Sequence, residues 1–131
     1  MAHLEEIYAA YLDCLNRQDW DHLGTFVGDN VEHNGRKLGL SGYQNMLIND
    51  YLAIPDLRFN AELLVCNGST LAARLRFDCS PMADFLGLPI NGKRMKFSEH
   101  AFYELESAKI SRVWSVIDKR EIERQLEGSD G

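Results

Sequence analysis

Ile110-Ser-Arg-Val-Trp-Ser-Val-Ile-Asp118 is an alternating, mostly apolar stretch that ends on a carboxylate. Successive side chains of a β-strand point to opposite faces, so Ile110, Trp114 and Asp118 are expected to share one face. If that face lines a cavity, loss of water around Asp118 raises its pKa toward neutrality, as a proton-abstracting base requires. The alternative is that Asp118 ends the strand and caps the following helix. The stretch therefore predicts a strand whose last residue is either a base or a cap.

The bulk properties indicate one soluble domain spanning residues 1–131, large enough to enclose a single small-molecule pocket. A net charge of -6 argues against binding to nucleic acid, whose phosphates would repel this surface, and gives no reason to expect binding to anionic membranes. No apolar run approaches the ~20 residues of a membrane span. The N-terminus lacks the basic segment and apolar stretch of a signal peptide, so a cytoplasmic location is expected.

Cysteine and histidine residues give no sign of a disulfide or a metal site. Cys14, Cys66 and Cys79 are odd in number and have no paired spacing, which suits free thiols in a reducing compartment. The four histidines are scattered, and no His-x-x-x-His or Cys-x-x-Cys pattern brings metal ligands together. No metal is therefore expected.

The order of periodic segments predicts helices first and strands afterwards. Apolar residues recur at helical spacing from Leu4 to Leu15, after Asp19, and between Ser41 and Pro55, with a short strand at residues 31–33. After Pro55 the period becomes alternating, and a terminal helix follows Asp118. This order predicts an α+β fold in which helices pack on one face of an antiparallel sheet.

The first predicted hairpin turns near Asn67-Gly68, and its register can be argued from parity. A two-residue loop would set apolar side chains beside Arg74 and Arg76. A three-residue loop aligns apolar with apolar and pairs Glu62 with Arg74. We expect the three-residue loop, with both arginines on the outer face and a second pair between Arg58 and Asp78.

The last hairpin turns at Ser107-Ala108 and leaves two registers open. An even loop pairs Glu106 with Lys109 and puts Glu99 on the Asp118 face. An odd loop brings Glu104 close to Arg112 and puts His100 beside Trp114 and Asp118, which we favour. The odd register makes Asp118 and His100 an acid–base pair. The even register makes Glu99 and Asp118 like charges on one face, which raises one pKa by repulsion.

Several motifs occur in a familiar order: Asp29-Asn-Val-Glu-His33, Ile54-Pro-Asp-Leu-Arg58, Leu71-Ala-Ala-Arg-Leu75, Phe85-Leu-Gly-Leu-Pro-Ile-Asn-Gly-Lys93 and Lys109-Ile-x-x-x-Trp114-x-x-x-Asp118. In this order and spacing the chain resembles, over nearly its whole length, the SnoaL-like polyketide cyclases, also called predicted ester cyclases, of the nuclear-transport-factor-two-like superfamily. It departs from many relatives at Pro81, where a polar pocket residue is replaced.

The resemblance implies a cone-shaped α+β barrel, in which a curved antiparallel sheet wraps around N-terminal helices and leaves a pocket at the open end. It implies homodimers formed through the outer sheet face. It also implies that Asp118 is the base that removes a carbon-bound proton from a polyketide ester, so that the enolate closes a ring. Neither metal nor organic cofactor is implied.

Our interpretation is a pocket protein for a small hydrophobic carbonyl-containing molecule, with cofactor-independent proton abstraction by Asp118. His100 or His33 would orient the base or relay its proton. The rival hypothesis is a non-catalytic ligand-binding or dimerisation module in which Asp118 is structural. The residues expected to line the pocket are His33, Trp114, Phe59, Phe85, Met46 and Tyr51.

Overall fold

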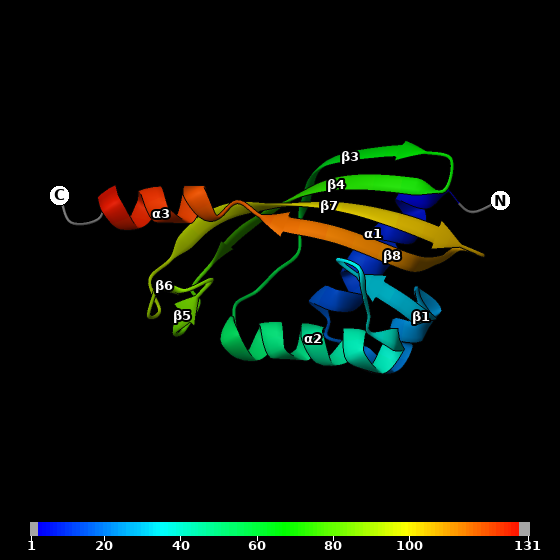
Figure 1. The fold of residues 1–131 in the computed structure, drawn as a ribbon, viewed down its shortest axis with the longest axis horizontal. Coiled ribbons are helices and arrows are strands. Elements are labelled where there is room, and N and C mark those ends of the chain that lie inside the picture. Colours follow the sequence, from blue (N-terminus) through cyan, green and yellow to red (C-terminus); the bar gives the residue numbers. More distant parts are fainter. Residues whose placement is uncertain (1–2, 129–131) are drawn as a thin grey trace.

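The computed structural model describes residues 3–128 and has the predicted α+β architecture (Figure 1). Its helical and strand elements follow one another in the predicted order, helices first. They are α1 (Leu4–Asn16), the 3-10 helix η1 (Trp20–Thr25), β1 (Val27–His33), β2 (Arg36–Lys37), α2 (Gly39–Ala53), β3 (Ala61–Asn67), β4 (Thr70–Cys79), β5 (Asp84–Phe85), β6 (Leu88–Pro89), β7 (Met95–Glu106), β8 (Lys109–Ile117) and α3 (Lys119–Gly128).

Six strands form one curved sheet in the order β2-β1-β8-β7-β4-β3. All neighbours are antiparallel except β1 and β8, which run parallel, so the expectation of a wholly antiparallel meander is wrong at that pair. The parallel pair joins an early strand to the last one. It therefore brings β1, near the start of the chain, against the end of the hairpin formed by β7 and β8.

Helices α1 and α2 lie on one side of this sheet, as Figure 1 shows. Their buried residues pack with the alternate residues of β4 and β7, so the core lies between helices and sheet. The sheet residues that face this core include Leu71, Leu75 and Phe77 on β4 and Phe97 and Tyr103 on β7. We call this the inner face, and the opposite one the outer face.

The hairpin of β3 and β4 has a two-residue loop and a bulge farther along. Asn67 pairs with Thr70, so the prediction of a three-residue loop is wrong. The register shifts between Ala61 and Leu63, which leaves Glu62 as an extra residue. Beyond the bulge the predicted alignment holds, and Arg74 Nε lies 2.7 Å from Glu62 Oε1. Between the bulge and the loop, the side chains of β3 point to the faces opposite to those predicted, so Leu63 lies on the outer face.

The hairpin of β7 and β8 is built in the same way. Glu106 pairs with Lys109 across Ser107-Ala108, whose backbone φ angles of 51° and 65° form a two-residue turn. Ser111 is then an extra residue, and from there Glu104 pairs with Arg112 and His100 with Val116. The even loop and the odd register therefore both occur, because the bulge at Ser111 converts one into the other.

Two further hairpins lie where loops were expected. Asn34-Gly35 turns β1 into β2, and Leu86-Gly87 turns β5 into β6, all four residues having positive φ. Both are two-residue turns of the kind that favours Asn and Gly. The second hairpin gives structure to the segment 79–92, and its Phe85 ring packs 5.6 Å from that of Phe97.

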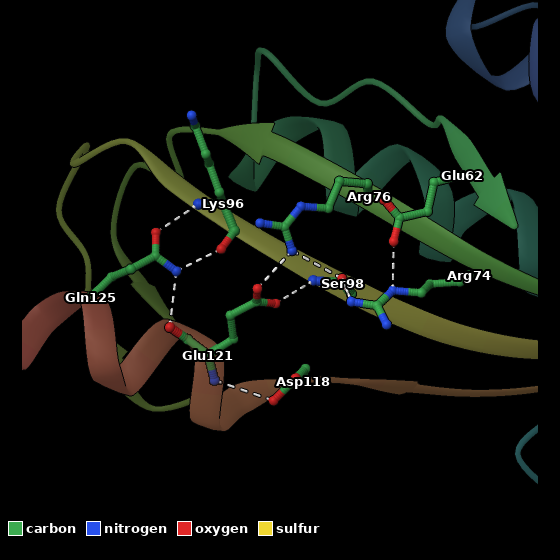
Figure 2. A network of polar contacts seen from close by, with 8 residues as sticks. All are labelled: Glu62, Arg74, Arg76, Lys96, Ser98, Asp118, Glu121 and Gln125. Carbon is green, nitrogen blue, oxygen red and sulfur yellow. Dashed lines mark hydrogen bonds and ion pairs between the residues drawn. The ribbon is translucent and has the colours of Figure 1, made fainter.

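Helix α3 is fixed to the end of the sheet by polar contacts, drawn in Figure 2. Glu121 Oε2 accepts from Arg76 Nη1 at 2.7 Å, and Glu121 Oε1 accepts from the Ser98 N–H at 2.9 Å. Arg76 and Ser98 alternate with inner-face residues, so these contacts are on the outer side of the sheet. Ile122 of the same helix is fully buried in the hydrophobic core. Helix α3 therefore lies at the end of the sheet, with polar contacts on the outer side and an apolar contact to the core.

Candidate functional site

A cavity of about 180 Å³ lies between α2 and the inner face of the sheet. A smaller hollow of about 60 Å³, lined by Phe77, Phe85 and Phe97, shares four of its wall residues. An engineered apolar cavity of ~150 Å³ holds a benzene molecule, so this space suits a molecule of about one ring. The walls of the larger cavity are Tyr11, His33, Tyr43, Met46, Leu47, Asp50, Phe59, Glu99, Tyr103, Val113, Ser115 and Ile117.

Two carboxylates line both hollows, Asp50 from α2 and Glu99 from β7. Burial, with a smaller contribution from the charge of Asp50, raises the pKa of Glu99 from 4.5 to about 7. Loss of surrounding water raises the pKa of Asp50 to about 6. Asp50 lies at the edge of the cavity, and part of the residue is exposed to solvent. A carboxyl group with a pKa near neutrality is suited to proton transfer at physiological pH.

Tyrosine hydroxyls supply hydrogen-bond donors to the same cavity. The Tyr8 hydroxyl donates to the Tyr103 hydroxyl at 3.0 Å, which leaves the hydrogen of Tyr103 available to another acceptor. The Tyr11 and Tyr43 hydroxyls are 2.6 Å apart and share one hydrogen, so the second hydrogen of that pair is also available. The cavity thus combines carboxyl groups with neutral donors that can hold a ligand oxygen.

His33 lies in the cavity wall, as predicted, and contacts Ser115. Its Nε2 atom is 3.0 Å from Ser115 Oγ, and its ring lies edge-on to that of Tyr43. Burial and the nearby Arg36 lower the pKa of His33 below 6.5. The imidazole is therefore mostly neutral at pH 7.

Asp118 is placed by its helix-capping contact. Its Oδ1 atom accepts from the Glu121 N–H at 3.2 Å, and its own N–H donates to the Ser98 carbonyl at 2.9 Å. Because Glu121 is the third residue of α3, this is the side-chain contact of a helix N-cap. The position of Asp118 is therefore that of a strand end and helix cap, the alternative raised from the sequence. Asp118 is absent from the walls of both inner hollows, and its role as a base stays a prediction.

His100 and Trp114 lie together on the outer face, where they line a shallow hollow with Phe102 and Val116. Trp114 is 40% exposed. The bulge at Ser111 is the reason, because it reverses the alternation after Ile110 and turns Ser115 inward in place of Trp114. The structure therefore does not bring these two residues to the cavity, which corrects the expectation that Ile110 and Trp114 share a face.

The remaining predicted wall residues lie at or near the cavity. Met46 and Phe59 line the larger hollow, and Phe59 and Phe85 line the smaller one. Tyr51 is buried behind Phe59, with ring centroids 6.3 Å apart, and its hydroxyl donates to the Leu15 carbonyl at 2.7 Å. It supports the wall rather than forming it.

Sequence reasoning missed Asp50 and considered Glu99 only in the rejected register. A signal existed for each. Asp50 follows Tyr43 and Leu47 at helical spacing, so it lies on the apolar side of α2. Glu99 alternates with Phe97 and Ala101, so it lies on the apolar face of β7. Within residues 3–128 no cluster of three potential metal ligands occurs, and no helix there is long and apolar enough to cross a membrane.

Comparison with known proteins identifies the family. Its model, described as SnoaL-like polyketide cyclase, matches residues 5–126. A SnoaL-like polyketide cyclase from Agrobacterium tumefaciens is 63% identical, with a TM-score of 0.95, over 96% of this chain and 99% of that one. No curated protein matches the chain.

More distant structures share the fold. IdmH from Streptomyces antibioticus has a TM-score of 0.82 at 15% identity, over 96% of this chain and 99% of its own. TsrD from Streptomyces laurentii has a TM-score of 0.80 at 22% identity, over 93% and 92%. The curved sheet packed on helices is that of this group. The chain belongs to the SnoaL-like polyketide cyclase family.

Proposed function

We propose that the cavity binds a small carbonyl-containing molecule and that Glu99 removes a proton from the carbon next to the carbonyl, with no cofactor. The observation that carries this proposal is a buried carboxyl group with a pKa of about 7 in the wall of a cavity that also holds hydroxyl donors. Near pH 7 about half of the Glu99 side chains are ionised, so the group both accepts and returns a proton readily.

The hydroxyl hydrogens of Tyr103 and of the Tyr11–Tyr43 pair support the second half of the reaction. Proton removal places negative charge on the carbonyl oxygen, and preorganised donors stabilise that charge in a site from which water is excluded. In a substrate with a second carbonyl, the enolate carbon would bond to the second carbonyl carbon and close a ring. The protonated Glu99 or water would then supply the proton to the new alkoxide.

Exchange of carbon-bound hydrogen tests this proposal directly. Cyclohexanone and acetophenone are one-ring ketones, and their incorporation of deuterium from D₂O can be followed by NMR beside binding shifts in the protein spectrum. Wild type should accelerate exchange, and Glu99→Gln should reduce the acceleration at least about 100-fold, the usual contribution of a general base. Asp118→Asn should keep it. Binding shifts without exchange would favour the rival, a non-catalytic ligand-binding module.

If Asp118→Asn rather than Glu99→Gln abolishes exchange, the base is the residue that the family resemblance implies. That result would overturn the role proposed for Glu99 and would require Asp118 to leave its capping position during the reaction. Glu106→Gln, on an exposed residue at the end of the same strand as Glu99, is the matched control and should change nothing.

We also propose that a second copy of the chain covers the outer face, and that the protein works in a reducing cytoplasm. The outer face carries Leu63, Val65, Phe102, Trp114 and Val116, which are 40% to 65% exposed. An apolar patch of this kind is unusual on a monomer and marks an interaction surface. The three cysteines, all within the described part of the chain, form no disulfide, which suits that compartment.

A further inference from the structure

Ser115 is held rigidly in the cavity wall by the residue that follows His33. Asn34 Oδ1 accepts from the Ser115 N–H at 2.8 Å, and Asn34 Nδ2 donates to the Ser115 carbonyl at 3.2 Å. The Asn34 N–H also donates to the carbonyl of Val113 at 2.8 Å. The residue after β1 is therefore joined to the backbone of β8 at Val113 and Ser115, and these bonds hold the backbone that carries the Ser115 hydroxyl.

The contact between Ser115 and His33 has the geometry of a nucleophile and its base. The separation of 3.0 Å between Oγ and Nε2 falls within the range of ~2.6–3.2 Å found for such pairs. Both side chains line the same cavity. A neutral imidazole has one nitrogen that can accept a proton, and burial together with Arg36 keeps His33 in that form.

We propose that Ser115 and His33 form a nucleophilic dyad that transfers the acyl group of small esters, of about one ring in size, to water. This activity is separate from the proton abstraction proposed for Glu99, because its nucleophile and its base are other residues of the same cavity. Nothing in the sequence marks it, since Ser115 lies in a strand and has no Gly-x-Ser-x-Gly turn around it.

The steps balance with water as the only second reactant. Ser115 Oγ bonds to the ester carbonyl carbon while its proton passes to His33 Nε2. The bond from that carbon to the alcohol oxygen breaks, and His33 returns the proton to the departing oxygen. Water then attacks the acyl–serine and gives a proton to His33, and the acid leaves as Ser115 Oγ regains its hydrogen. The free hydroxyl hydrogen of Tyr103 is a donor for the negative oxygen formed at each attack.

Covalent labelling tests the dyad without knowledge of the natural ester. Phenylmethylsulfonyl fluoride is a one-ring reagent that sulfonylates activated serines, and peptide mass spectrometry locates the adduct. One group should attach to Ser115 of the wild type, and His33→Gln should slow the reaction at least about 100-fold. Ser111→Ala, on the bulge residue whose hydroxyl donates to the Glu104 carbonyl, is the matched control and should label normally.

Further variants test the dyad itself. Glu106→Gln, on an exposed residue outside the cavity, should label like wild type. The thiol introduced by Ser115→Cys should react with iodoacetamide faster than it does with His33→Gln added, which tests the contact between the two positions with a second reagent. An unlabelled wild type, an adduct at another serine, or equal rates with and without His33 would each overturn the dyad.

Discussion

Glu99 and Asp50 face the same cavity from opposite walls, one from the sheet and one from α2, and the charge of Asp50 helps to keep Glu99 protonated. The raised pKa means that the folded protein binds this proton more tightly than the unfolded chain does. Between pH 4.5 and about 7 the folded state therefore holds more protons, and stability falls as the pH rises through this window.

Glu99→Gln should remove the part of this pH dependence that comes from Glu99 and leave the part that comes from Asp50. Above pH 7 the variant should be more stable than wild type by up to on the order of 3 kcal/mol, because no buried charge has to form, whereas below pH 4.5 the two should differ little. Urea unfolding at pH 4.5, 6 and 8 measures the difference, with Glu106→Gln as control. A constant difference at all three values would contradict the assignment.

Asp118 should show the behaviour of a helix cap. Asp118→Ala loses the contact with the Glu121 N–H and should lower the free energy of unfolding by about 1 kcal/mol, whereas Asp118→Asn keeps an oxygen that can accept. Chemical denaturation of the three proteins measures both changes. Equal losses for Ala and Asn would indicate that the carboxylate charge, rather than the cap, stabilises this end of the sheet.

Glu121 should matter more than other acidic residues of α3. Glu121→Gln weakens its contacts with Arg76 and the Ser98 N–H and should cost about 2 kcal/mol, because both lie in partly buried surroundings. Glu127→Gln is the matched control, since its contact with Arg120 is exposed at 3.6 Å and should contribute little. If the two variants unfold alike, the network of Figure 2 does not fix the helix.

The outer face should control assembly. Val116→Arg puts a charge in the exposed apolar surface, and it should weaken self-association at least about 100-fold because the charge would be buried without a partner. Sedimentation of wild type and variant over a range of concentrations measures this. Leu52→Arg, on an apolar residue of α2 that is 72% exposed, should leave assembly unchanged. A monomeric wild type would end the proposal.

The sequence was sufficient for the longer helices and strands and their order because periodicity depends on many residues at once. The helical spacing of apolar residues from Leu4 to Leu15 and their alternation from Leu71 to Phe77 each extend over several residues. A single residue that departs from the pattern therefore does not change the predicted element. The ion pair between Glu62 and Arg74 and the alignment of Glu104 with Arg112 were predicted for the same reason.

The face of the sheet on which each side chain lies was harder to predict, because a bulge is a single residue that has no sequence signal of its own. Ser111 and Glu62 are ordinary strand residues in sequence, yet each reverses the alternation of its strand. Glu99 was within reach, since it interrupts an apolar face. The contact of His33 with Ser115 was not, because it joins parallel strands that are far apart in the chain.

Because of the bulge at Ser111, the number of residues in the last strand decides which of its side chains line the cavity. Deletion of Ser111 would rotate everything after it by half a turn, so that Trp114 and Val116 would enter the cavity and Ser115 would emerge on the outside. Among related chains, those that differ by one residue between Ile110 and Asp118 would thus present a different wall to their ligand with no change of residue type.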